Sequence, residues 1–139
     1  MSLEHQRGES RRWLRQAEDD ISAVVVLLEH AKYSQACFLS QQAGEKAIKA
    51  VWYWQGREPW GHSIAKLIDD LPAEETRIAL VAFREDAVAL DKLYIPTRYP
   101  NGLPELLPAE AYGKGDGARA LQCAKNLIRI AGDLTKVGE

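Results

Sequence analysis

The stretch that decides the fold is residues 34–55, SQACFLSQQAGEKAIKAVWYWQ. Helical spacing places small residues and one tryptophan on a single seam, made of Ala36, Ser40, Ala43, Ala47, Ala50 and Trp54. A second side carries Phe38, Ile48 and Trp52, and a third carries Tyr53. Small side chains let a neighbouring helix approach closely, and apolar residues on several sides predict contacts in several directions. We therefore expect a helix that is central in a bundle or shared with a partner subunit.

Four further helices are predicted around this one. They span about residues 9–31, 63–71 and 73–94, and a last one runs from 116 or 118 to 135. Ser10 is a candidate N-cap of the first helix, and Gly56 a candidate C-cap of the second. The apolar stripe of the first helix leaves Asp19 and Asp20 where carboxylates can stay in water. Pro96 ends the fourth helix, because the residue before a proline is pushed out of the α region.

Residues 96–117 form the one long interruption of this helical pattern. They hold four of the six prolines and four of the ten glycines, so we expect a long structureless loop there, of a length that tends to be functional or mobile. The predicted fold class is all-α: an antiparallel four- or five-helix bundle with a Pro/Gly-rich loop before the last helix. The chain is short enough for a single domain, residues 1–139, with its core at about 9–136.

Composition excludes several classes of protein. Eighteen Lys and Arg against twenty Asp and Glu give a net charge of −2, so no overall basic field indicates nucleic-acid binding. No apolar run reaches the roughly 20 residues that span a bilayer, and residues 1–13 lack the apolar segment of a signal peptide. Cys37 and Cys123 have no Cys or His partners at metal-ligand spacing. We expect a cytoplasmic protein with no metal, cofactor or membrane association.

The densest polar group on an apolar element is QQAGEKAIK, residues 41–49. Gln42, Glu45 and Lys49 share one face of the second helix, Lys46 lies beside them, and Glu45 precedes Lys49 at the favourable i, i+4 spacing. One interpretation is a solvated face with a weak ion pair. The other is a ligand site, since this helix has little surface to spare.

Two further candidates lie in turns. In YIPTRYP, residues 94–100, two prolines stiffen the chain around Arg98, and Tyr94 and Tyr99 can stack on its guanidinium or on a base. The alternative is a helix stop whose arginine bonds the last carbonyls. His62 precedes the third helix, where a capping or packing role is the common one. The common catalytic motifs are absent, and Gly113, Gly115 and Gly117 follow no strand, so they do not indicate a phosphate loop.

Taken together, AEDDISAVVVLLEHAKYSQACFLSQQAGEKAIKAVWYWQG (residues 17–56), His62-Ser63 and LYIPTRYP (residues 93–100) resemble the HEPN family (higher eukaryotes and prokaryotes nucleotide-binding domain), in its small stand-alone prokaryotic branch. The resemblance covers about residues 12–134. It implies a helical bundle that forms a homodimer, associates with nucleotides or RNA, and often pairs with a minimal nucleotidyltransferase. Many members of that family are endoribonucleases, and several are toxins of toxin–antitoxin pairs, so the resemblance also implies RNA cleavage as a candidate activity.

The nuclease members carry an arginine followed after four to six residues by a histidine. Arg98 is followed at those spacings by Leu103, Pro104 and Glu105, and none of these is a histidine. Arg57-x4-His62 has the spacing but lies between the second and third helices.

Two functions of the protein are therefore weighed. The first is a module that binds a nucleotide, RNA or nucleotidyltransferase through Gln42, Glu45, Lys46, Lys49, Tyr94, Arg98 and Tyr99. The second is a metal-independent endoribonuclease in which Arg98 stabilises the phosphate and His62 or Tyr99 replaces the missing base. A third possibility is a polar lock between subunits. The ligand-site hypothesis requires the side chains of Arg98 and of the polar residues of the second helix to meet at one shared cleft.

Overall fold

The computed structural model of the chain describes residues 2–136. Seven α-helices lie within that range: α1 (Leu3–Glu29), α2 (Tyr33–Trp54), α3 (Ile64–Asp69), α4 (Glu74–Leu80), α5 (Arg84–Asp91), α6 (Pro108–Ala111) and α7 (Lys114–Leu134). Two 3₁₀ turns cover Val81–Phe83 and Pro100–Gly102. No strand occurs among the described residues, so the predicted all-α class is confirmed. None of these helices is both long and apolar enough to cross a membrane.

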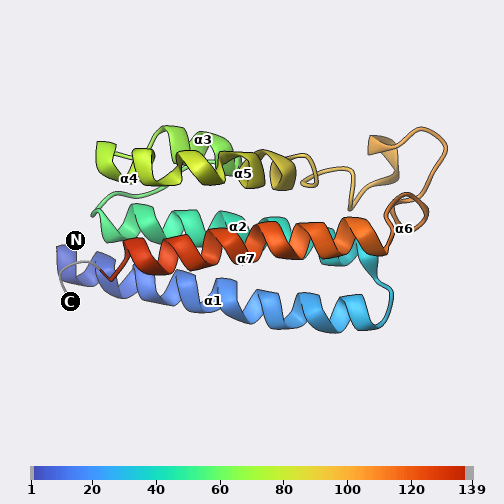
Figure 1. The fold of residues 1–139 in the computed structure, drawn as a ribbon, viewed down its shortest axis with the longest axis horizontal. Helices are drawn as coiled ribbons and strands as arrows, with labels where there is room; N and C mark the ends of the chain where they lie inside the picture. The colour runs from blue at the N-terminus through green and yellow to red at the C-terminus, as the bar shows by residue number, and fades with distance from the viewer. Residues whose placement is uncertain (1, 137–139) are drawn as a thin grey trace.

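Helix α2 lies in the middle of the bundle (Figure 1). Helices α1, α2 and α7 run side by side along the long axis, and α3, α4 and α5 cover the side of α2 and α7 that is remote from α1. The predicted contacts of the second helix in several directions are therefore met within one chain. Of the two expectations for this helix, a central place in the bundle is the one that the structure shows.

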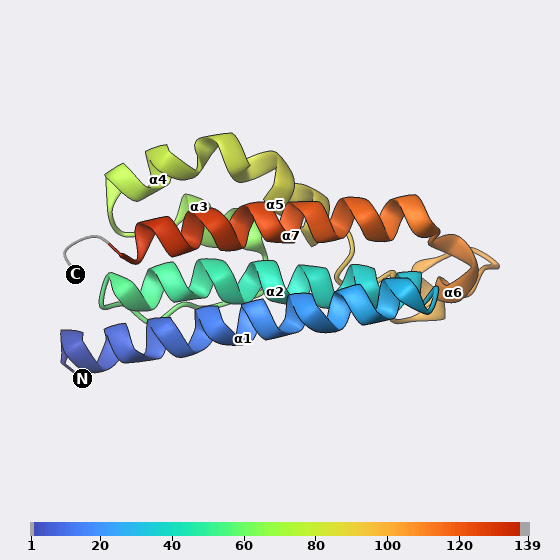
Figure 2. The ribbon, with the colours of Figure 1, turned by 60° about the horizontal axis from the view of Figure 1, so that its bottom comes forward.

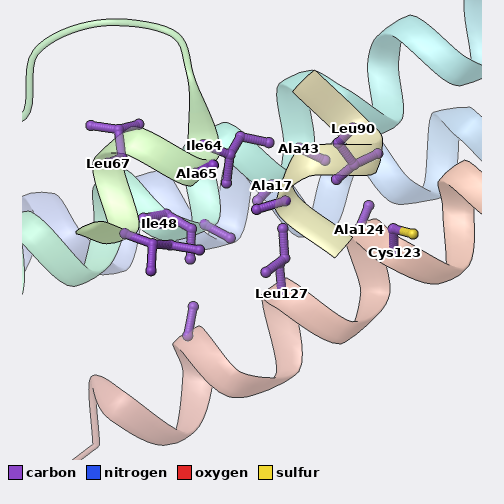
Figure 3. Packing of buried hydrophobic residues seen from close by; sticks show 14 of the residues in the cluster. Ala17, Ala43, Ile48, Ile64, Ala65, Leu67, Leu90, Cys123, Ala124 and Leu127 are labelled. Atoms are coloured by element: carbon purple, nitrogen blue, oxygen red, sulfur yellow. The ribbon is translucent and has the colours of Figure 1, made fainter. Parts of the chain in front are cut away.

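The core forms where four helices meet (Figure 3). Ile48 of α2, Ile64 of α3, Leu90 of α5 and Leu127 of α7 are all fully buried. Burying side chains of this size stabilises the fold by about 1.5–3 kcal/mol each relative to exposure. The predicted small-residue seam of α2 is buried as well, which explains how helices on both of its sides come close.

The end of α2 and the start of α1 test the two predicted caps. Gly56 ends α2 as predicted, although the cap residue itself is Gln55 and Gly56 lies one residue beyond it: Gly56 has φ +76°, its amide donates to the Tyr53 carbonyl, and the Arg57 amide donates to the Trp52 carbonyl. The N-cap at Ser10 is wrong. Helix α1 begins at Leu3 with Ser2 as its cap, because residues 3–9 are mostly good helix formers that extend the helix. Ser10 is fully buried and its hydroxyl donates to the Ala50 carbonyl at 2.6 Å.

The fourth predicted helix, residues 73–94, is not continuous. Helix α4 ends at Leu80, a 3₁₀ turn follows, and α5 ends at Asp91, so that the chain bends between α4 and α5 (Figure 2). The apolar stripe continues across the break, since Leu80, Ala87 and Leu90 are all fully buried. Periodicity alone cannot separate one helix from two short ones that share a buried stripe.

The expectation of a structureless loop at residues 96–117 is also wrong. This segment contains a 3₁₀ turn and the short helix α6, which starts at Pro108, where a proline is well tolerated. Helix α7 begins at Lys114, earlier than predicted, because the Asp116 carboxylate accepts a hydrogen bond from the Gly113 amide and completes the first turn.

Candidate functional site

Three aromatic rings surround the guanidinium of Arg98. Its Cζ atom lies 4.4 Å from the ring centre of Phe38, 4.6 Å from that of Tyr94 and 5.0 Å from that of Tyr99. Its Nε donates a hydrogen bond of 3.0 Å to the Tyr94 carbonyl. Arg98 thus stacks on tyrosines, as one of the two interpretations expected, and also bonds a carbonyl, although that carbonyl lies in the turn after α5 (Asp91 is its last residue) and not in the helix. The contact of Phe38 with Arg98 was not expected, because the sequence pattern indicated only that Phe38 lies on one side of the second helix.

The backbone around Arg98 is held by short-range hydrogen bonds. The amides of Arg98 and Tyr99 both donate to the Ile95 carbonyl, at 3.0 and 3.3 Å. Thr97 is buried, and its hydroxyl donates to the Leu93 carbonyl. Among the described residues, no carboxylate forms an ion pair with Arg98 and no acceptor is bonded to its terminal nitrogens. A guanidinium fixed in this way presents two unused –NH₂ groups, which suits it to an anion such as phosphate.

His62 links Tyr94 to the second helix. The imidazole stacks on the Tyr94 ring with centroids 5.4 Å apart and an angle of 16° between the planes. Its Nδ1 lies 3.3 Å from Oε2 of Glu45. The expected capping role belongs instead to Ser63, whose hydroxyl accepts from the Lys66 amide. His62 therefore joins the cluster of Arg98 and Glu45, although its side chain stays 63% exposed.

Glu45 and Lys49 form a buried ion pair. Lys49 Nζ lies 3.0 Å from Oε2 of Glu45, and the two side chains are only 11% and 8% exposed. The interpretation of these residues as a solvated face is therefore wrong. Gln41, which the sequence did not single out, is fully buried and donates to Glu45 Oε1 and to the His62 carbonyl, both at 3.4 Å. Gln42 in turn donates to Gln41 Oε1 at 2.6 Å.

Lys46 lies on the other side of α2, toward α1. Its Nζ is 2.5 Å from Oδ2 of Asp20, and Gln16 donates to Oδ1 of the same carboxylate at 3.0 Å. The expectation that Asp20 stays in water is wrong, since Asp20 is 7% exposed. One residue step turns a helix by about 100°, so Lys46 points toward α1, at about a right angle to its neighbour Glu45. The cluster around Arg98 consequently contains Glu45 and Lys49, and Lys46 belongs to a separate polar network.

Asp91 positions the segment that carries His62. Its carboxylate accepts from the Ile64 amide at 2.7 Å, the Ala65 amide at 3.0 Å and the Ser63 hydroxyl at 2.9 Å. These bonds hold the start of α3 against the end of α5, close to Tyr94. Within residues 2–136, no group of three or more His, Cys, Asp or Glu side chains could hold a metal ion.

The comparison with known families follows the same stretch of the chain. The profile of the HEPN domain matches residues 10–134. The chain belongs to the HEPN family. The relative named "Putative toxin MJ1304", from Methanocaldococcus jannaschii, is 28% identical to this HEPN protein in an alignment of 131 residues that covers 89% of this chain and 86% of that protein.

Three crystal structures resemble this HEPN protein. TT1696 from Thermus thermophilus has a TM-score of 0.83 and 34% identity over 90% of this chain and 97% of its own. ST0689, described as an archaeal HEPN homologue, has a TM-score of 0.74 and 34% identity over the same shares. The HEPN domain protein TM0613 of Thermotoga maritima has a TM-score of 0.71 and 31% identity over 91% and 98%.

Proposed function

We propose that this HEPN protein binds a nucleotide, or a nucleotide within an RNA chain, at the aromatic cluster around Arg98. The observation that carries the proposal is a guanidinium held by three rings and by no carboxylate within residues 2–136. The terminal nitrogens of Arg98 bond the phosphate in a bidentate manner. Tyr99 is 47% exposed and offers a face on which a base can stack.

The residues of α2 support this site from beneath. Lys49 is already neutralised by Glu45, so its part is to hold that carboxylate in place. Glu45 in turn orients His62, and Gln42 fixes the amide of Gln41. In this arrangement Arg98, Tyr99 and His62 contact the ligand, while the buried groups of α2 hold the surrounding side chains in position.

The biological setting that we propose is a toxin–antitoxin-type pair with a minimal nucleotidyltransferase, in which this chain acts as a homodimer. The toxin name carried by the Methanocaldococcus relative supports the pair, and the family resemblance supports the dimer. Light scattering on the purified protein tests the dimer. Co-expression with an adjacent nucleotidyltransferase gene, followed by purification through a tag on one protein, tests the partner: a stable complex supports it, and separate elution contradicts it.

Calorimetric titration with ATP, GTP and short RNAs tests the ligand. We expect at least one of them to bind, and Arg98→Gln to weaken that binding about tenfold or more, as loss of a charge-assisted bidentate contact predicts. Arg129→Gln, at an exposed site on α7, is the matched control and should leave binding unchanged. Absence of binding by every ligand at low salt would refute the proposal. If Arg98→Gln instead dissociates the dimer and lowers the melting temperature without changing ligand binding, the polar lock between subunits is the correct function.

A second candidate function is RNA cleavage, favoured by the contact between Glu45 and His62. A carboxylate at Nδ1 holds the imidazole so that Nε2 of the exposed ring can act as a base. His62 would remove the proton of a ribose 2′-hydroxyl while its oxygen attacks the adjacent phosphorus. The bond to the 5′-oxygen breaks and that oxygen takes up a proton, which leaves a 2′,3′-cyclic phosphate and a 5′-hydroxyl end, with Arg98 stabilising the charge on the phosphate.

Cleavage of a fluorescent RNA by the purified protein in EDTA tests this second function. Activity that is lost in His62→Asn and in Arg98→Gln, but kept in Arg129→Gln, would support it. Intact RNA after long incubation, together with normal growth of cells that express the protein, would exclude it and leave the binding function.

A further inference from the structure

The segment formed by α4 and α5 is apolar on two sides, although it lies on the outside of the bundle (Figure 2). Its inner side holds the fully buried residues Leu80, Ala87 and Leu90. On its outer side, Ile78 is 65% exposed and Val81 is 69% exposed. A surface helix needs only one apolar stripe, and large aliphatic side chains grouped in the open mark interaction sites. The second stripe therefore indicates a surface that another molecule covers.

The outer side continues along α5 with a regular spacing. Val81, Glu85, Val88, Lys92 and Ile95 follow one another at steps of three or four residues, which places them on one side of a helix. The turn after α5 keeps short-range helical hydrogen bonds as far as the Tyr94 amide. These five positions, called the outer stripe below, thus follow α5 and the turns at both of its ends.

The surface along the outer stripe is concave. A depression of about 390 Å³ is lined by Arg84, Glu85, Val88, Ala89 and Lys92. A neighbouring depression of about 290 Å³ shares Arg84 and includes Ile68, Ile78 and Val81. Val88 and Ala89 are half-buried, and side chains of this size let the backbone of another helix approach closely. The outer stripe is therefore shaped to receive a helix.

The two charged residues of the outer stripe are not used within the chain. Glu85 and Lys92 are both exposed, and neither forms an ion pair or a side-chain hydrogen bond within residues 2–136. Neighbouring charges do have partners, since Arg84 pairs with Asp69 at 2.8 Å and Asp91 caps α3. One anion and one cation are thus left on the stripe, three and four residues to either side of Val88.

This order of side chains is self-complementary. In a two-fold symmetric contact, a residue i that meets residue j of the second copy is matched by j meeting i. If two outer stripes run antiparallel about an axis at Val88, the Val88 side chains face each other. Glu85 then faces Lys92 of the second copy, and Val81 faces Ile95. Each apolar residue meets an apolar one and each charge meets its opposite, which is the complementarity that a specific interface requires.

We propose that the outer stripe of α5 packs antiparallel against the outer stripe of a second copy, with reciprocal ion pairs between Glu85 and Lys92. The inference rests on the homodimer of the proposed function and adds its interface. It also places the second copy beside the ligand site, because the Ile95 carbonyl accepts the amides of Arg98 and Tyr99. Val81 of one copy, on Ile95 of the other, would hold the segment that carries Arg98.

Sedimentation velocity of the full chain over a range of concentrations tests the proposal through charge reversal. Glu85→Lys and Lys92→Glu should each raise the dissociation constant of the dimer about tenfold or more, because each creates two facing pairs of like charge. An equimolar mixture of the two variants should restore the affinity, since every lysine then faces a glutamate in the heterodimer. The double variant Glu85→Lys, Lys92→Glu should also dimerise like the wild type.

Lys125→Glu, at an exposed position of α7, is the matched control and should leave the dissociation constant unchanged. Circular dichroism checks that all variants fold. Val81→Ser, at a site that is 69% exposed, should weaken the dimer without any change of charge.

A wild-type dimer that neither charge reversal weakens would refute this interface and leave the proposed homodimer standing. A monomeric wild type would refute both. If the monomer instead forms a complex with the co-expressed nucleotidyltransferase that is lost in Val81→Ser, the outer stripe belongs to that partner and the proposal is wrong. Titration of the wild type with ATP and GTP measures the proposed ligand binding separately from all of these outcomes.

Discussion

A β-carbon added at Gly44 would lie 2.8 Å from Cδ1 of Leu90. The same atom would be 3.2 Å from Cδ1 of Ile64 and of Leu127. Helices α3, α5 and α7 therefore all meet α2 at a point where it has no side chain, one residue before Glu45. This close approach brings the start of α3, with His62, and the end of α5, with Tyr94, onto the polar face of α2.

Gly44→Ala should destabilise the protein by about 1–3 kcal/mol, because overpacking of a filled core forces neighbouring side chains out of their rotamers. Urea denaturation followed by circular dichroism measures the change. Gly132→Ala is the matched control: nothing lies within 4 Å of its added methyl group, so alanine in the interior of α7 should stabilise by about 0.5–1 kcal/mol. Equal effects of the two substitutions would contradict the packing argument.

Asp91→Ala should lower the free energy of unfolding by about 1–3 kcal/mol, since it leaves two amides at the start of α3 and the Ser63 hydroxyl without their acceptor. Asp69→Ala is the control, because Asp69 pairs with Arg84 at the surface, where such pairs contribute little. The NMR signals of the His62 ring should shift in Asp91→Ala and stay in place in Asp69→Ala. Unchanged His62 signals in both variants would show that Asp91 does not position the imidazole.

Glu45→Gln should destabilise by about 3–5 kcal/mol, because it leaves the Lys49 ammonium buried without a counter-ion. The double variant Glu45→Gln, Lys49→Met should recover a large part of this loss, since it removes the unpaired charge as well. A double-mutant cycle in urea measures the coupling. Additive effects of the two substitutions would mean that the pair is as weak as an exposed one.

The thiol of Cys37 should resist alkylation by iodoacetamide at pH 8–9 in the folded protein, because burial raises its pKa from 9.0 to about 12. Above pH 9 the thiol ionises in the unfolded chain but stays protonated in the folded one. The free energy of unfolding should therefore decrease with rising pH up to about pH 12, by at most about 1.4 kcal/mol per pH unit for this group. Cys37→Ala should remove that part of the slope, and rapid labelling of the wild-type thiol in native buffer would contradict its burial.

Local patterns were sufficient for part of the site. The two prolines and two tyrosines around Arg98 indicated its stacking as one of two interpretations, and the i, i+4 spacing of Glu45 and Lys49 predicted their pair. Phe38, Gln41 and Asp91 were not predicted, because each acts through a contact with a residue distant in the sequence. Asp91 is 27 residues from the amide of Ile64 that it caps, and no pattern within α5 reveals such a partner.

The sequence by itself determined that the fold is helical, that the helix over residues 34–55 makes contacts in several directions, and that this helix ends at Gly56. These features follow from hydrophobic periodicity and backbone preference, which act over a few residues. Only the tertiary structure decided that His62 joins Arg98 through Tyr94 and that Lys46 turns to Asp20. Those relationships depend on how helices far apart in the chain pack, and α2 can pack so closely against α3, α5 and α7 because Gly44 leaves them room.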